Sequence, residues 1–140
     1  MARFLALFFA ALLALPLSGQ EAREVAVQFA TAYESGDPAA ACYVFFNGKH
    51  VGDMGGTPEE LENDLLPEEL RKNKKNPATV EMLECVFSPA DAAYGCDVWY
   101  AVYLARGKKH KLCLYRIDGQ WKVDLSYLWM GDWYDWMPGY

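Results

Sequence analysis

Residues 79–125 read TVEMLECVFSPADAAYGCDVWYAVYLARGKKHKLCLYRIDGQWKVDL. Four runs within this stretch are rich in Val, Tyr, Trp, Cys or Leu and are bounded by turn residues, a pattern typical of strands joined by hairpins. The runs cover residues 79–88, 94–104, 111–117 and 121–127. The stretch therefore predicts a four-stranded antiparallel meander, and such a sheet needs a cover on one face.

The hairpin between the second and third runs suits a two-residue turn that begins at Gly107. That register predicts one continuous apolar face, built from three facing pairs: Val102 with Cys113, Tyr100 with Tyr115, and Val98 with Ile117. The other face mixes polar and apolar side chains and reads as neither core nor solvated surface. Its residues are Asp97, Trp99, Ala101, Tyr103, His110, Leu112, Leu114 and Arg116.

The next turn contains Asp118-Gly119, a dipeptide that favours a tight two-residue turn. A tight turn would place Trp121 opposite Arg116 and split the apolar face. A three-residue loop with a bulge instead places Trp121 opposite Tyr115 and Val123 opposite Cys113. The longer loop is therefore the predicted connection.

The N-terminal residues predict export. Arg3 is followed by an apolar run to Leu17 that is too short to span a bilayer comfortably, and then by Ser18 and Gly19. Residues 1–19 thus predict a signal peptide, a secreted or periplasmic location, and no membrane span after cleavage. An uncleaved anchor is the alternative, because the cleavage site is imperfect. Residues 20–128 are enough for one domain, and residues 129–140 form a C-terminal tail.

Charge disfavours one class of partner. The chain carries 13 basic and 19 acidic residues, a formal net charge of −6. Its two basic clusters, residues 71–75 and 106–111, therefore read as a helix end and an edge turn. Nucleic acid is not a predicted partner.

The residues before the sheet predict helices. Val25, Phe29, Ala32 and Tyr33 have helical spacing over residues 21–35, and Gly36 ends the helix. Asp37-Pro38 predicts a second short helix over residues 39–43, followed by a brief strand at 44–46. Residues 49–56 predict a glycine-rich loop, and Thr57-Pro58-Glu59-Glu60 predicts the capping box of a further helix. Asn76-Pro77 ends that helical region.

This order of elements resembles the nuclear-transport-factor-2-like superfamily, an α+β roll or cone of cystatin-like architecture. The residues that carry the resemblance are Phe29, Ala32, Tyr33, Gly36, Asp37 and Ala40 in the helices and residues 118–123, DGQWKV, at the last hairpin. The resemblance implies N-terminal helices packed on a curved, mainly antiparallel meander sheet, with a pocket between the two.

The same resemblance implies a choice between catalysis and binding. Members such as ketosteroid isomerases and dehydratases use a carboxylate base with Tyr or protonated Asp donors, whereas other members only bind ligands or partners. The candidate polar residues here are Tyr33, Tyr100, Tyr115, His50 and Asp53. They repeat no enzymatic motif, and a Tyr on an apolar strand face is more often a core residue than an acid catalyst.

The predicted function is therefore a non-catalytic domain, without a cofactor, that binds a small apolar ligand or a protein partner. Its predicted pocket residues are Phe29, Tyr33, Tyr100, Tyr115 and Trp121. A small lyase or isomerase is one alternative. A homodimer through the mixed sheet face is also compatible with the pattern.

Metal binding is disfavoured by the available ligands. His50 and His110 lie far apart in the sequence, and no Cys pair has zinc spacing. Residues 50–53 could hold a cation weakly, but a surface loop is the favoured interpretation.

Four cysteines in an exported chain favour disulfides. If residues 89–93 form the first hairpin turn, Cys85 faces Cys96 and Leu83 faces Val98. Cys113 would lie about 20 Å from Cys96, beyond the ~7 Å limit on Cα separation. The predicted pairs are therefore Cys85 with Cys96 and Cys42 with Cys113.

The end of the chain is rich in aromatic residues. Residues 129–140 contain Trp129, Trp133, Tyr134, Trp136 and Tyr140. Either this tail folds back over the open end of the cone, or it forms an adhesive surface for a carbohydrate, cell surface or partner. Folding back is favoured, because Gly131 and Pro138-Gly139 allow the chain to turn.

Overall fold

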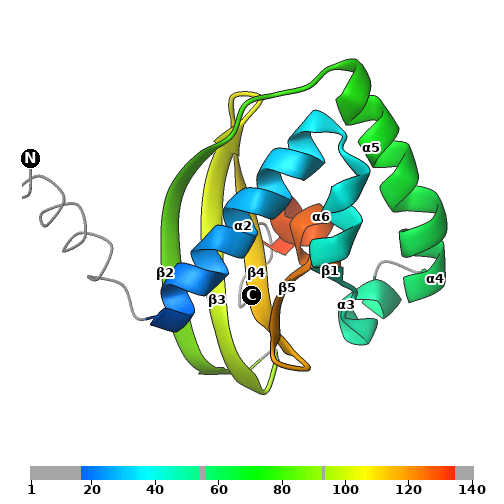
Figure 1. Cartoon of the computed structure of the whole chain (residues 1–140). Helices are drawn as coiled ribbons and strands as arrows, with labels where there is room; N and C mark the ends of the chain where they lie inside the picture. Colours follow the sequence, from blue (N-terminus) through cyan, green and yellow to red (C-terminus); the bar gives the residue numbers. More distant parts are fainter. Residues whose placement is uncertain (1–16, 54–55, 93, 135–140) are drawn as a thin grey trace, which may run out of the picture.

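The computed structural model describes residues 17–134, apart from residues 54–55 and 93. Within these ranges the chain is α+β, as predicted, with helices packed on a five-stranded mixed sheet (Figure 1). The strands are β1 (Val44–Phe45), β2 (Glu81–Asp91), β3 (Cys96–Ala105), β4 (Lys108–Ile117) and β5 (Gln120–Asp124). Their order is β1-β5-β4-β3-β2, so β1 and β2 are the edges. β1 is parallel to β5, whereas β2 to β5 form the predicted antiparallel meander.

All helical segments except α6 precede the meander in the chain. The helical segments are α2 (Leu17–Ser35), the 3₁₀ segment η1 (Pro38–Tyr43), α3 (Gly48–Asp53), α4 (Pro58–Glu60), the π-helical segment η2 (Leu61–Leu65), α5 (Leu66–Lys75) and α6 (Leu125–Tyr134). In the described ranges no helix is long and apolar enough to cross a membrane. The predicted domain boundaries, 19/20 and 128/129, fall inside α2 and α6.

The predicted helix caps are confirmed. The Asp37 side chain accepts a hydrogen bond from the Ala39 backbone N–H at 2.9 Å, which starts η1. The Thr57 hydroxyl accepts one from the Glu60 N–H at 3.3 Å, and Pro58 occupies the first turn of α4. The loop predicted over residues 49–56 is wrong in part, because Gly48–Asp53 forms the helix α3.

The last strand is shorter than predicted. β5 ends at Asp124 and α6 begins at Leu125, so residues 125–127 are helical. The fully buried Asp124 carboxylate explains the change, because it accepts hydrogen bonds from the Ser126 hydroxyl and, at 3.4 Å, from the Tyr127 N–H. Asp124 is therefore the N-cap of α6.

Both of the predicted hairpin registers differ from the structure. The β3–β4 turn consists of Arg106 and Gly107, one residue earlier than predicted, so Tyr100 lies opposite Cys113. The two turn residues have φ values of 57° and 71°, as in the mirror-image turns that match the twist of a sheet. Because the turn begins one residue earlier, each β3 residue pairs with a β4 residue two positions from the predicted one. A shift of two positions leaves each side chain on its predicted face.

The β4–β5 turn is a tight two-residue turn and not the predicted three-residue loop. Asp118 and Gly119 form a two-residue turn with φ values of 51° and 79°, and Trp121 lies opposite Arg116. The three-residue loop was predicted on the assumption that the face carrying Tyr100 and Tyr115 is the main core, and that assumption is wrong. The tight turn instead places Trp121 on the face that α2 covers.

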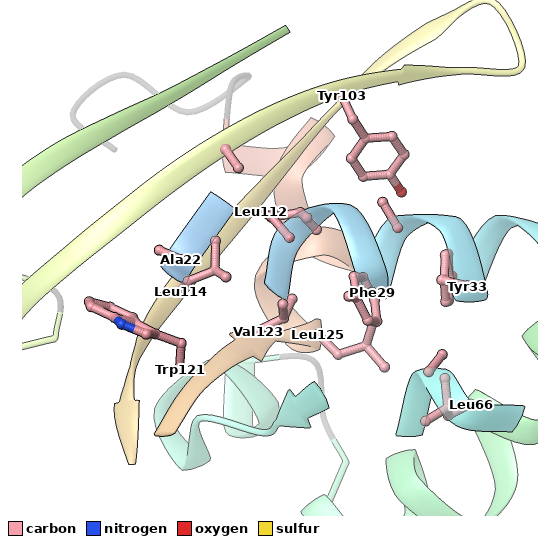
Figure 2. Close-up of a cluster of buried hydrophobic side chains, with 14 of the residues drawn as sticks. Ala22, Phe29, Tyr33, Leu66, Tyr103, Leu112, Leu114, Trp121, Val123 and Leu125 are labelled. Carbon is pink, nitrogen blue, oxygen red and sulfur yellow. The ribbon is translucent and has the colours of Figure 1, made fainter. Parts of the chain in front are cut away.

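The main core lies between α2 and the face that the sequence described as mixed. Figure 2 shows Phe29 of α2 near Leu112, Val123 and Leu125, with Ala22, Leu114 and Trp121 at one end of the cluster. Ala22, Ala26 and Ala30 are fully buried, and their small side chains let the helix approach the sheet closely. Helix α2 covers this face, so the structure gives no support to the predicted dimer through it.

The opposite face carries a smaller cluster. Val98, Cys113 and Tyr115 are buried there, and five partly buried residues pack against them: Phe45, Tyr94, Tyr100, Ile117 and Tyr127. The predicted apolar face is thus the second core.

An ion pair between a buried carboxylate and a partly exposed arginine joins α2 to the β3–β4 hairpin. The Glu34 side chain, 4 % exposed, accepts hydrogen bonds from the Arg106 Nε at 2.9 Å and from the Tyr103 hydroxyl at 3.0 Å. One Arg106 terminal nitrogen also donates to the Glu34 carbonyl at 3.1 Å and to Asn73 of α5 at 3.3 Å. Asn73 in turn donates to the Tyr33 carbonyl at 2.8 Å. These contacts fix α5 and the hairpin against the end of α2.

Candidate ligand-binding groove

The predicted pocket residues do not meet in one pocket. Phe29 and Tyr33 stack at 5.3 Å between ring centroids inside the main core. Tyr100 and Tyr115 lie on the other face of the sheet, whereas Trp121 lies with the main core. The structure therefore divides the predicted set between two faces.

Tyr33 is engaged by the last helix. Its hydroxyl accepts a hydrogen bond from the Trp129 indole N–H at 2.9 Å, and Trp129 also packs on Phe46 with centroids 6.4 Å apart. Burial raises the pKa of Tyr33 to about 12. Trp129 therefore folds back onto the core, while the side chains of residues 130–134 and all of residues 135–140 lie outside the described structure.

Tyr100 takes part in a group of tyrosines and carboxylates on the second face. Its hydroxyl donates to Asp91 at 2.7 Å, and the Tyr94 hydroxyl donates to Asp124 at 2.8 Å. Burial is the main cause that raises the pKa of both phenols. Because the Asp124 carboxylate also accepts from Ser126 and Tyr127, both of its oxygens are already engaged.

The buried phenols predict a loss of stability in alkali. The pKa of Tyr33 rises from 10.0 to about 12 on folding, so the folded state holds this proton more tightly than the unfolded state. The contribution of the Tyr33 proton to the free energy of unfolding is complete below pH 10 and is lost as the pH rises from 10 towards 12. We expect the free energy of unfolding, measured by urea titration, to fall by about 1 kcal/mol at pH 11 from this group alone. Tyr33→Phe should reduce the fall, and stability that rises above pH 10 would contradict the expectation.

A groove opens at the end of the main core, beside the first turns of α2. Its volume is about 340 Å³, and four neighbouring strands contribute to its lining: Phe87 of β2, Cys96, Asp97 and Trp99 of β3, Arg116 of β4, and Trp121 of β5. Phe87 lies opposite Trp99 in the sheet, and Arg116 lies opposite Trp121. Sheet pairing therefore aligns three aromatic rings and one guanidinium along this groove.

The first turns of α2 border the groove. The Glu21 carboxylate lies 3.4 Å from the Arg116 guanidinium, and Gly19 lies so close to Trp99 that a Cβ at this position would sit 2.6 Å from the ring. The guanidinium carbon also lies 5.1 Å from the centre of the Trp121 ring, in a cation–π contact. Phe87 packs against Trp99 with centroids 5.1 Å apart and remains 44 % exposed.

Two residues that line this groove have buried indole N–H groups. Trp99 and Trp121 are 3 % and 9 % exposed, and neither N–H makes a hydrogen bond within the part of the chain that the structure describes. A buried N–H without a partner costs about 1 to 3 kcal/mol. Both nitrogens are covered by protein atoms, so they lie behind the lining of the groove and not on its surface.

A second groove, also about 340 Å³, lies between η1 and α5. Pro38, Leu66 and Leu70 provide apolar lining, and Glu62, Arg71 and Lys74 provide charges. Among the described residues around it, none has a buried donor that lacks a partner. The first groove is the stronger candidate because three aromatic rings line it, whereas none of the described residues that line the second is aromatic.

Sequence reasoning found Trp121 but missed Phe87, Asp97, Trp99 and Arg116. It assigned Trp99 and Arg116 to the mixed face, and it noted that a tight turn would pair Arg116 with Trp121. The signal was therefore present in the Asp118-Gly119 dipeptide, which favours that turn.

His50 and Asp53 lie in α3 rather than in a loop, and their side chains are outside the described structure. In the part of the chain that the structure describes, no group of three or more His, Cys, Asp or Glu residues could hold a metal ion.

The four cysteines are free thiols in the structure. Cys85 lies opposite Ala101, and Cys96 lies opposite Asp91, so the predicted juxtaposition of Cys85 with Cys96 is wrong. Cys96 is five residues from Ala101 along β3, about 17 Å, which is too far for a disulfide. Cys42 is exposed and Cys113 is buried, and no bond joins them. Burial raises the pKa of the Cys113 thiol and favours its protonated form.

The chain was compared with protein-family models, curated proteins and solved structures, and none of them matches it.

Proposed function

We propose that this protein is an exported, non-catalytic domain of the nuclear-transport-factor-2-like, cystatin-like type that binds a small apolar ligand in the groove beside α2. The order of helices and strands and the apolar N-terminal run support the fold type and the export. The groove carries the functional part of the proposal, because it combines a volume of about 340 Å³ with the rings of Phe87, Trp99 and Trp121. Ligand pockets of soluble proteins typically have this apolar lining with a few polar groups.

Two alternatives have weaker support. A lyase or isomerase would need a carboxylate free to accept a proton, but the buried Asp124 already has hydrogen-bond partners on both oxygens. A carbohydrate platform would need exposed indole faces, whereas Trp99 and Trp121 are both at least nine-tenths buried. The contacts of these residues favour ligand binding.

The uncharged dye N-phenyl-1-naphthylamine, which fluoresces strongly in apolar sites, tests the proposal. We expect it to bind the protein with a stoichiometry of one. Phe87→Ser should weaken binding at least about tenfold, because the variant removes a ring that the ligand would cover. Phe87 is half-exposed, so the variant should still fold, which circular dichroism would check.

Leu65→Ser is the matched control. Leu65 has nearly the same exposure as Phe87, 42 % against 44 %, but lies in η2, away from the groove. Its variant should bind the dye like the unmodified protein. An equal loss in both variants, or no binding to the unmodified protein, would overturn the proposed function.

A further inference from the structure

We propose that the end of the molecule opposite the groove is a basic surface that binds a membrane of anionic phospholipids peripherally. The inference goes beyond the proposed ligand and does not depend on it.

Folding joins the two basic clusters of the sequence into one surface. Arg106 of the β3–β4 turn donates a hydrogen bond to the Asn73 side chain of α5 at 3.3 Å, and it pairs with Glu34 near the end of α2. Figure 1 shows the C-terminal end of α5 and the β3–β4 hairpin at the same end of the molecule. We call the Lys and Arg residues of 71–75 and 106–109 the basic pole. They are Arg71, Lys72, Lys74, Lys75, Arg106, Lys108 and Lys109.

The basic pole concentrates positive charge in an acidic protein. It holds seven of the 13 Lys and Arg residues. Three carboxylates pair with its cations, those of Glu34, Glu68 and Glu69. Glu81 lies opposite Leu104, next to the hairpin. The pole with these four acids has a formal charge of 7 − 4 = +3, so the rest of the chain carries −6 − 3 = −9. This separation of charge turns the pole towards an anionic surface.

Four lysines of the pole are available to a partner. Lys74 and Lys75 end α5, Lys108 and Lys109 begin β4, and all four are exposed. Among the residues that the structure describes, no carboxylate forms an ion pair with any of the four. An anionic partner can therefore reach them without breaking an ion pair of the protein.

The kind of anion is inferred from the chemistry and placement of these lysines. A lysine ammonium is a point charge, whereas recognition of a single phosphate or carboxylate favours the fork of an arginine. Lys108 lies opposite Ala105 of the main core, and Lys109 points to the other face of the sheet. The lysines thus surround the tip of the hairpin and do not follow one track, which favours a flat layer of phospholipid headgroups over a single polyanionic chain.

The contact is expected to be electrostatic and to leave the groove open. The exposed large apolar residues of the described ranges all lie outside the pole, so no side chain of the pole is suited to insert among acyl chains. Helix α2 runs from Gly19 beside the groove to Glu34 at the pole, and its 19 residues span about 28 Å. A membrane at the pole would therefore not cover the groove.

Co-sedimentation with vesicles tests the inference on the unmodified protein. At an ionic strength of about 0.05 M the protein should bind vesicles of equal parts phosphatidylglycerol and phosphatidylcholine, and it should not bind phosphatidylcholine alone. Salt at about 0.5 M should release it, because the charges are then screened. Binding to both kinds of vesicle, or binding that survives the salt, would overturn the inference.

A double variant tests whether the two clusters act together. Lys75→Gln/Lys109→Gln removes one exposed lysine from each and should weaken binding to the anionic vesicles at least about tenfold. Gln28→Glu/Gln120→Glu is the matched control, because it makes the same change in net charge at exposed positions outside the pole. The control should change the affinity less than about threefold. Equal losses in the two variants would refute a role of the pole.

Two further measurements separate the possible partners and the two proposals. At equal concentrations of anionic groups and equal salt, the vesicles should bind more tightly than heparin, and tighter binding of heparin would overturn the choice of a membrane. The Lys75→Gln/Lys109→Gln variant should bind the naphthylamine dye like the unmodified protein, and Phe87→Ser should bind the vesicles normally. Failure of the dye to bind would leave the membrane inference standing, whereas loss of vesicle binding in Phe87→Ser would contradict the location of the surface.

Discussion

Gly36→Ala should lower the free energy of unfolding by about 2 to 5 kcal/mol, measured by urea denaturation. Gly36 has a φ of 75° at the end of α2, where a residue with a Cβ is strained. A Cβ there would also lie 2.5 Å from the Leu70 carbonyl oxygen, and closer still to the Lys74 backbone nitrogen. Both atoms belong to the backbone of α5, so no side-chain rotation relieves the clash.

Gly119→Ala separates strain from clash. Gly119 has nearly the same φ, 79°, but nothing lies within 4 Å of an added Cβ. This variant should cost only about 1 to 2 kcal/mol, the usual penalty for the left-handed conformation. Equal losses at the two glycines would mean that α5 does not pack against the end of α2 as described.

Arg106→Ala should lower the free energy of unfolding by about 3 kcal/mol, because it leaves the Glu34 carboxylate buried without its cation. The Tyr103 hydroxyl would remain as a donor but cannot neutralise the charge. The variant also removes the link from the hairpin to Asn73 of α5. Chemical denaturation at pH 7 would measure the change.

Arg116→Ala is the control for an exposed pair. Arg116 and Glu21 have side chains about half exposed, and their closest atoms are 3.4 Å apart. Solvent screening should limit the loss to less than about 1 kcal/mol. If both arginine variants lose the same stability, burial of Glu34 is not the cause of the larger effect.

Local patterns in the sequence predicted much of the fold. The helical spacing of Val25, Phe29 and Tyr33 predicted α2, and the caps at Asp37 and Thr57 lie where their side chains suggested. Each of the four predicted meander strands is present, with end shifts of a few residues. Such signals depend on neighbours within a few positions, so they can be read without knowledge of the rest of the chain.

Which face of the sheet became the main core depended on contacts between distant residues. Alternation along β3 and β4 separates the two faces, but both carry aromatic and aliphatic side chains, so the pattern alone does not say which of them a helix covers. Packing against Ala22, Ala26 and Phe29 buries Trp99, Ala101 and Tyr103. The register at Asp118-Gly119 and the Trp121 position follow from that choice.

The groove likewise depends on residues that only the folded chain brings together. Phe87, Trp99, Arg116 and Trp121 come from four strands, and Glu21 comes from α2, 95 residues before Arg116. Amphipathic patterns and turn residues specify helices and strands locally. The pairing of strands and the seating of α2, which minimise exposed apolar area across the whole chain, place these side chains beside one another.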